Sequence, residues 1–355
     1  MNAAISRETI QYSANVFRHD LPAIVELLSD SIRNIQITPE TLLEVRENLE
    51  LDIANLSSKP ETVIPELLHM AAYDEKGLGN SLLSAEGIVA NISQEAIEDY
   101  VRTFFVTEGV VLAAAGANHL DLVSLARKHL GDMPATNRTL TNEPSVYSGG
   151  ERRVPEEGLP FVHLALGFEG VSYNDPDFFA VSTLQTLLGG GSSFSSGGPG
   201  KGMNSRLYTR VLNGYEWVES ATAINFSYTD AGMFGIQGAC VPRYADEFLS
   251  VLCRELKHAG SKIGEEELGR AKNQLKSMLL INLEMIAIQC EDIGRQVQTF
   301  GHRVSPAELC ARIEAVTVGD VMRATRRLLA AKPTLVSLGD IERVPRLHDV
   351  ARHLR

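Results

Sequence analysis

The sequence has no long hydrophobic run, and it is short of basic residues. The longest uncharged apolar stretch, Val110 to Ala117, is far too short to cross a bilayer. Lysine and arginine number 33 against 45 aspartates and glutamates, and the net charge of −12 argues against a protein that follows nucleic-acid phosphates. An acidic chain suits basic ligands, although many proteins are acidic for solubility alone.

The few cysteines and histidines form no metal-binding motif. Cys240, Cys253, Cys290 and Cys310 contain no Cys-x-x-Cys pair, so we expect reduced core residues, with a zinc or disulfide role as the alternative. No two of the nine histidines stand four residues apart. Both His-Glu-x-x-His and the inverse His-x-x-Glu-His are therefore absent, and the sequence predicts no zinc-peptidase helix.

The composition that remains is that of an ordinary globular protein. Apolar residues make up 44% of the 355 residues and charged residues 22%. At roughly 150 residues per domain, this length corresponds to about two domains, each large enough to bury a core.

The chain repeats itself at an offset of about 225 residues. The matching segments are 14–33 with 239–258, 37–56 with 263–282, and 92–117 with 316–341. Chance similarity between helices would not keep this order and spacing, so we infer a duplication.

Each copy predicts the same elements in the same order, a strand, an amphipathic helix, two further helices and a strand. The first copy places strands at Ile10–Val16 and Val110–Ala115, a helix capped by Asp20, a helix from Thr38-Pro39 and a helix at Gln94–Phe104. The second copy places strands at Gly232–Val241 and Thr334–Leu338, a long helix at Glu265–Phe300 and a helix at Gly319–Leu329. These patterns predict an α+β fold of two homologous domains, each a mixed or antiparallel sheet with helices packed on one face.

The second copy begins with residues that have no counterpart in the first. Residues 161–228 add two expected strands and a helix capped by Asp175. We therefore expect the first domain, 1–134, to lack about its first 65 residues. Residues 135–160 are rich in Pro, Gly, Thr, Asn and Glu and predict an interdomain linker, and 161–355 form the second domain.

The most unusual segment is glycine-rich, at residues 189–203, GGGSSFSSGGPGKGM. Its spacing fits neither Walker A nor Gly-x-Gly-x-x-Gly nor Gly-x-Ser-x-Gly. Glycine gives a loop the backbone freedom to adapt to a ligand, and Phe194 and Lys201 would be its apolar and charged contacts. The alternative is a surface linker.

Three carboxylates on the predicted long helix form a second candidate site. Glu267 and Asp292 would share a face of a straight helix at roughly 37 Å, too far for a joint acid/base pair but suited to holding an extended basic peptide at two points. Glu291 adjoins the second point. The alternative is a solvated helix face, with the acidic first turn favouring the helix N-terminus.

Several segments of the chain resemble those of a known family. The segments LQTLLGGGSSFSSGGPGKGMNSRLYTRVLN, RAKNQLKSMLL, EDIGRQV, PELLHMAAY and YSGGE resemble those of the alpha subunits of the mitochondrial processing peptidase, which belong to the pitrilysin-type metallopeptidases. The resemblance implies two homologous pitrilysin-type domains and a heterodimer with a beta subunit in the mitochondrial matrix. It implies zinc in the beta partner and no cofactor in this chain. The implied role is to recognise the basic presequences of imported precursors, without catalytic residues of its own.

The resemblance also implies the substrate-binding residues. They are Gly189, Gly190, Gly191, Ser192, Ser193, Phe194, Ser195, Ser196, Gly197, Gly198, Pro199, Gly200, Lys201, Gly202, Met203, Glu267, Glu291 and Asp292. Ser192 replaces a usual fourth glycine and Asn204 a usual aromatic residue. In this family about 65 residues and a transit peptide would precede Met1.

Two other functions compete with presequence recognition. Core subunits of respiratory complex III share the fold, and association with the inner membrane through that complex would favour this role. A catalytic pitrilysin-type peptidase that has lost its metal helix is the third reading, and the alpha-type glycine segment disfavours it.

Overall fold

The computed structural model covers residues 1–355 and describes all of them except 57–58, 84–86, 136–142, 193–202 and 355. The chain folds into two compact units. Unit 1 consists of Met1–Asn55, Leu82–Asn142 and Ile281–Val304, and unit 2 of Leu56–Ser81, Glu143–Leu280 and Ser305–Arg355.

Unit 2 is built on a six-stranded mixed sheet with the order β3-β8-β4-β7-β6-β5. Only β3 and β8 are parallel, and every other neighbouring pair is antiparallel. The strands are β3 (Gly150–Pro155), β4 (Val162–Glu169), β5 (Gly190–Ser192), β6 (Val218–Ser227), β7 (Gly232–Cys240) and β8 (Thr334–Gly339). The mixed sheet confirms the predicted α+β class.

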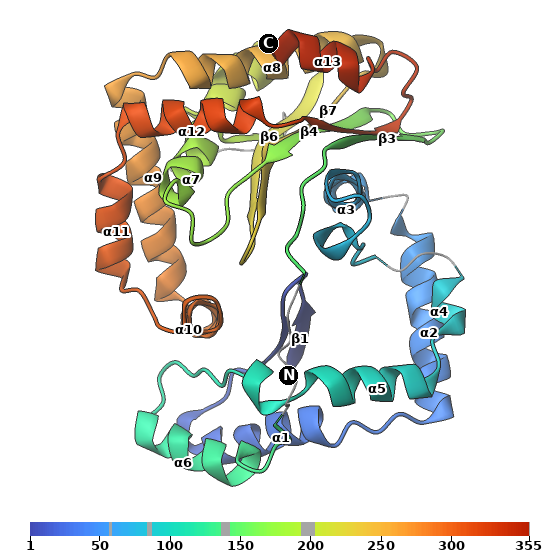
Figure 1. Cartoon of the computed structure of the whole chain (residues 1–355), viewed down its shortest axis with the longest axis vertical. Helices are drawn as coiled ribbons and strands as arrows, with labels where there is room; N and C mark the ends of the chain where they lie inside the picture. The colour runs from blue at the N-terminus through green and yellow to red at the C-terminus, as the bar shows by residue number, and fades with distance from the viewer. Residues whose placement is uncertain (57–58, 84–86, 136–142, 193–202, 355) are drawn as a thin grey trace. The chain divides into compact units, whose positions relative to one another are not determined.

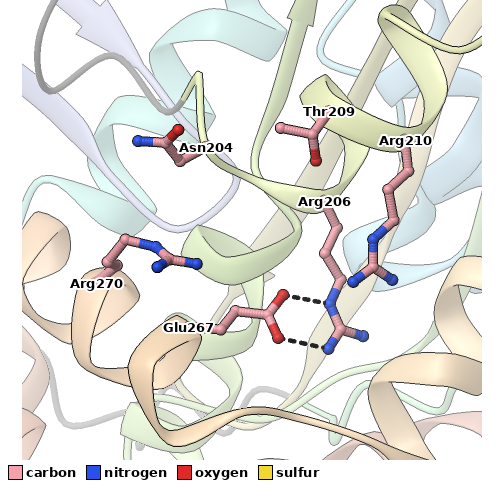
Figure 2. A pocket seen from close by; sticks show the side chains of 6 residues that line it. All are labelled: Asn204, Arg206, Thr209, Arg210, Glu267 and Arg270. Atoms are coloured by element: carbon pink, nitrogen blue, oxygen red, sulfur yellow. Dashed lines mark hydrogen bonds and ion pairs between the residues drawn. The ribbon is translucent and has the colours of Figure 1, made fainter.

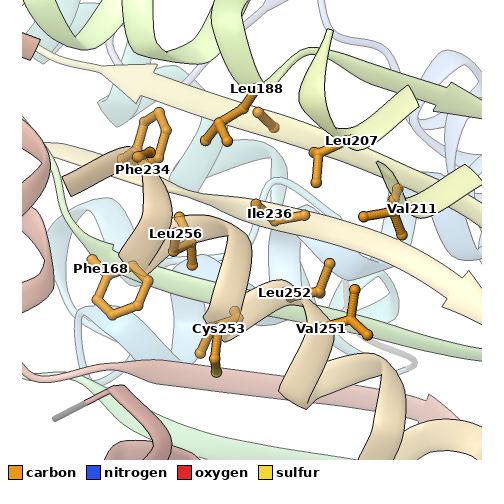
Figure 3. Close-up of a cluster of buried hydrophobic side chains, with 14 of the residues drawn as sticks. Phe168, Leu188, Leu207, Val211, Phe234, Ile236, Val251, Leu252, Cys253 and Leu256 are labelled. Atoms are coloured by element: carbon orange, nitrogen blue, oxygen red, sulfur yellow. The ribbon is translucent and has the colours of Figure 1, made fainter. Parts of the chain in front are cut away.

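The helices of unit 2 pack mainly on one face of this sheet (Figure 1). They are α7 (Phe178–Leu188), α8 (Ala245–Ser261), α9 (Glu265–Glu284, of which the last four residues belong to unit 1), α11 (Pro306–Glu314), α12 (Val318–Ala330) and α13 (Leu347–Leu354). A short π-helix, η5, spans Leu207–Leu212. Figure 3 shows the resulting core, in which Phe168, Phe234 and Ile236 of the strands meet Leu252 and Leu256 of α8.

The other face of the sheet is partly covered by α3 (Pro60–Ala72). Ile64, Leu68 and Ala72 recur every four residues along this helix and are buried against strand residues such as Ala165 and Met233. Side chains alternate between the two faces of a strand, which is why neighbouring residues of β4 and β7 serve different cores. The sheet of unit 2 therefore carries helices on both faces.

A buried histidine joins α3 to the end of β6 and the residue that follows it. His69 is 0% exposed, and its Nδ1 lies 2.7 Å from the Pro65 carbonyl oxygen. A carbonyl oxygen only accepts, so Nδ1 carries the proton and Nε2 accepts a 2.6 Å hydrogen bond from the Tyr228 hydroxyl. Phe226 packs edge-on against the same ring.

His69→Ala is expected to lower the free energy of unfolding by about 2–4 kcal/mol, because it opens a cavity and leaves the Tyr228 hydroxyl without this partner. Tyr228→Phe removes the hydrogen bond and keeps the ring, so we expect about 1–2 kcal/mol. Urea unfolding measures both. His258→Ala, at an exposed position of α8, is the control and should change stability by less than about 0.5 kcal/mol. Equal losses in the His69 and His258 variants would contradict the buried contact.

Unit 1 is mostly helical in its described residues. It contains a two-stranded antiparallel ladder, β1 (Asn2–Ile5) with β2 (Ile10–Ser13). Its helices are α1 (Leu21–Arg33), α2 (Pro39–Ala54), α4 (Ile88–Asn91), α5 (Gln94–Phe104), α6 (His119–Leu130) and α10 (Ile286–Phe300).

Each unit includes one helix that, along the chain, lies between segments of the other unit. The repeat offset of about 225 residues places α3 on α10. Helix α3 lies between two segments of unit 1 along the chain but belongs to unit 2, and α10 lies between two segments of unit 2 but belongs to unit 1. In unit 1, Cys290 and Gly294 of α10 lie against Ala113. The predicted repeat offset thus relates these two helices, and the duplication itself stays a prediction.

Several predicted element boundaries are confirmed. Helix α2 begins after Thr38 with Pro39 in its first turn, and Thr38 and Thr41 form a reciprocal capping box. Helix α5 spans Gln94–Phe104 as predicted, capped by Ser93. Each of these starts is a local side-chain-to-backbone arrangement, which the sequence can specify without tertiary information.

The predicted long helix Glu265–Phe300 is wrong. It is two helices, α9 and α10, separated by Met285, whose ψ of 116° is extended. No proline or glycine marks this break in the sequence. The end of α9 and the whole of α10 belong to a different unit from the start of α9, so tertiary packing rather than a local breaker accounts for it.

Three smaller predictions are also corrected. Val110–Ala115 is not a strand, because no described residue of unit 1 pairs with it, whereas its equivalent β8 is paired on both sides. The predicted linker 135–160 contains β3, which pairs with β8. The N-cap position of helix α7 is Asp177, which makes no side-chain capping hydrogen bond, rather than Asp175, whose carboxylate accepts the Asp177 N–H at 2.8 Å. The borders 134/135 and 160/161 themselves stay predictions.

The predicted core position is confirmed for two of the four cysteines, whereas Cys290 and Cys310 are only partly buried. All four are free, and Cys240 and Cys253 are buried in the core of unit 2. Burial raises the pKa of both thiols to about 12, which keeps them protonated and unreactive.

Candidate functional site

The glycine-rich segment begins as part of the sheet. Gly189 ends α7 with φ +56°, and Gly190 to Ser192 form β5, which pairs with β6. A Cβ atom on Gly190, whose φ is +121°, would lie 1.9 Å from the Ala221 carbonyl oxygen. A Cβ on Gly191 would meet nothing within 4 Å. The first two glycines are therefore required by the fold, and the third is not.

The two ends of the segment are held together. The Gly190 N–H donates a 3.2 Å hydrogen bond to Oγ of Ser205, just beyond the far end of the segment. Met203, the last predicted site residue there, is 41% exposed. The predicted contacts from Ser193 to Gly202, Phe194 and Lys201 included, lie outside the described residues.

A pocket opens beside the far end of the segment, where η5 meets the start of α9 (Figure 2). Its volume is about 440 Å³. The lining residues are Asn204, Arg206, Thr209, Arg210, Glu267 and Arg270. Three arginines face one glutamate here, so the lining is cationic rather than acidic.

Glu267, predicted to bind basic peptide, is paired within the chain. Its two carboxylate oxygens accept hydrogen bonds from Nε and Nη2 of Arg206 at 2.6 and 2.8 Å, a bidentate pair (Figure 2). The Arg206 and Glu267 side chains are 2% and 20% exposed. Burial acts to raise the pKa of Glu267, but the Arg206 guanidinium and the Gly264 N–H outweigh it and hold that pKa below its ordinary value.

The other two predicted carboxylates lie on α10 in unit 1. Asp292 is 7% exposed and accepts a 2.8 Å hydrogen bond from Nε2 of Gln296, whose Oε1 accepts from the Val304 N–H at 2.6 Å. Arg295 pairs with the other Asp292 oxygen. Asp292 therefore helps to fix the end of α10, whereas Glu291 is exposed.

The structure brings together the two ends of the glycine-rich segment and Glu267, all in unit 2. Glu291 and Asp292 belong to unit 1, so whether all three carboxylates serve one peptide stays a prediction. Arg206 and Arg210 were not among the predicted residues. Their spacing of four in SRLYTR, directly after the glycine-rich segment, is the sequence signal that could have indicated them.

Membrane-spanning helices and metal clusters are both missing from the described parts of the chain. No helix among the described residues is both long enough and apolar enough to span a membrane. No group of three or more His, Cys, Asp or Glu side chains among them is placed to hold a metal ion.

Comparison with known families identifies the class of this fold. Residues 1–86 match the model of the insulinase family, peptidase family M16, and residues 91–275 match that of the peptidase M16 inactive domain. A chain of complex III from Candida albicans, solved with Inz-5 bound, superposes with a TM-score of 0.81. It is 21% identical, with 94% of this chain and 79% of that chain covered, which establishes a shared fold.

Relatives in sequence indicate which branch of peptidase family M16 the chain is similar to. The mitochondrial-processing peptidase subunit alpha of Neurospora crassa is 37% identical over 93% of this chain and 70% of its own length. The human subunit alpha is 36% identical over 96% of this chain and 68% of its own length. The chain belongs to the mitochondrial-processing peptidase alpha-subunit family within peptidase family M16.

Proposed function

We propose that this chain is the substrate-recognition subunit of a mitochondrial processing peptidase. It binds the basic N-terminal presequences of imported precursors in the mitochondrial matrix, and a beta subunit, which supplies the zinc, cleaves them. The observation that carries this proposal is the 37% identity over 93% of the chain to a relative named as subunit alpha.

The glycine-rich segment supports a role in peptide contact. Its described ends are fixed by the pairing of β5 with β6 and by the Gly190–Ser205 hydrogen bond. Rigid anchors with a glycine-rich connection are suited to an adaptable binding loop. The exposed carboxylate of Glu291 is a contact for a presequence arginine.

Deleting residues 193–202 tests this function. We expect presequence affinity, measured by fluorescence titration with a labelled presequence peptide on the heterodimer, to fall at least tenfold. Cleavage by the heterodimer should fall with it, while heterodimer formation stays intact because β5 and Ser205 are kept. The matched control removes residues 136–142 from the predicted linker and should leave affinity unchanged.

Two results would contradict the proposal. One is unchanged affinity in the 193–202 deletion, and the other is zinc-dependent presequence cleavage by the purified chain without a beta subunit. Circular dichroism on each variant separates loss of binding from loss of folding.

A second candidate function is that of a core subunit of respiratory complex III. The TM-score of 0.81 to a chain of that complex favours it. Purification from mitochondria distinguishes the two roles, because a core subunit would co-purify with cytochromes and a soluble peptidase subunit would not.

A further inference from the structure

The pocket between η5 and α9 contains a buried guanidinium group with unused donors. Arg206 is 2% exposed. Its Nε donates to Glu267, and its Nη2 donates to Glu267 and, at 2.6 Å, to the Lys262 carbonyl oxygen. A guanidinium has five N–H groups, so these bonds use three of them. The remaining two are on Nη1, which is buried and has no hydrogen-bond partner among the described residues.

Two further arginines line the pocket beside these donors. Arg210 and Arg270 line the same pocket, with side chains 45% and 49% exposed. Figure 2 shows the Arg210 guanidinium on the side of Arg206 that faces away from Glu267. The one carboxylate of the lining, Glu267, already accepts two hydrogen bonds from Arg206. Outside the lining, Glu255 pairs with Arg210 and Glu266 pairs with Arg270. Most N–H groups of the two arginines remain available.

We propose that this pocket binds an oxyanion, held between Nη1 of Arg206 and the guanidinium of Arg210. A carboxylate or phosphate gives the two buried donors a charge-assisted partner, which is a stronger acceptor for a guanidinium than a neutral water molecule. The volume of about 440 Å³ leaves room for the group to which the oxyanion is attached. The ligand is therefore an acidic side chain of a peptide or a phosphate, opposite in charge to a basic presequence.

The proposed oxyanion site adjoins the glycine-rich segment. Asn204 of the pocket lining follows Met203 directly, so the oxyanion would lie at the far end of the glycine-rich segment. Nothing in this binding requires presequence recognition, and the two are tested separately.

The test uses two probes on the full chain, inorganic phosphate and the peptide N-acetyl-Asp-Glu-amide, by isothermal titration at constant ionic strength balanced with chloride. We expect saturable binding of at least one probe. Arg210→Gln and Arg270→Gln should each weaken it at least fivefold, and the double variant more. Binding of the peptide alone identifies a carboxylate ligand, and binding of phosphate alone identifies a phosphate.

Arg254→Gln is the matched control. Arg254 is 49% exposed and, like Arg210, pairs with Glu255, but it does not line the pocket. It should leave affinity unchanged. No saturable binding of either probe, or an equal loss in the Arg254 and Arg210 variants, would overturn the proposal. Arg206→Lys is assayed as well where thermal unfolding shows that it folds, and it should weaken binding because a lysine ammonium lacks the guanidinium fork.

Discussion

Replacing Glu267 by alanine is expected to lower the free energy of unfolding by about 3–5 kcal/mol, because it leaves the Arg206 guanidinium buried without its carboxylate. The pair is bidentate, and the arginine is 2% exposed, so solvent does little to compensate. Urea unfolding at neutral pH measures the loss.

Glu266→Ala is the control in the same helical turn. Its side chain is 91% exposed and pairs with Arg270 at 2.7 Å, and surface pairs of this kind contribute less than about 1 kcal/mol. Similar losses in the two variants would show that the Arg206–Glu267 pair has no special weight in the fold.

Acid should reduce the difference between wild type and Glu267→Ala. The pKa of Glu267 is lowered in the folded chain, so its contribution to stability is fully present above the unfolded value of about 4.3. It is lost as the pH falls through the lower folded pKa. The difference in unfolding free energy should therefore be constant near neutral pH and shrink below about pH 4. A difference that grows on acidification would contradict this assignment.

The second large effect is expected at Gly190. In Gly190→Ala the new Cβ would lie 1.9 Å from the Ala221 carbonyl oxygen, at a φ of +121° that residues with side chains rarely adopt. Backbone strain and overpacking together should cost about 2–6 kcal/mol and disrupt the pairing of β5 with β6. Thermal unfolding measures the loss, and hydrogen exchange at β5 and β6 reports the pairing.

Gly191→Ala provides the neighbouring control. Its added methyl group has nothing within 4 Å and its φ is not positive, so stability should change by less than about 1 kcal/mol. Equal changes in stability at the two positions would contradict a clash that is specific to Gly190. This contrast also separates glycines that the fold requires from those available to a binding loop.

The predicted site and the structure agree in part, and the differences have physical causes. The glycine-rich segment stands out by composition alone, and the structure shows that Gly190 to Ser192 form a strand in which Gly190 avoids a backbone clash. Glu267 looked available for a ligand because a sequence gives the charge of a residue but not its partner. That partner, Arg206, is 61 positions away. The cationic pocket depends on the same long-range approach.

The sequence by itself predicted the duplication and determined the α+β class, the helix starts at Pro39 and Gln94, and the segments that place the chain in its family. These rest on local capping, hydrophobic periodicity or residue identity, none of which needs distant contacts. Only the tertiary structure decided the break at Met285, the exchange of α3 and α10 between units, and the lack of a strand at Val110–Ala115. Each depends on which distant segment packs or pairs beside it, and local preference cannot supply that information.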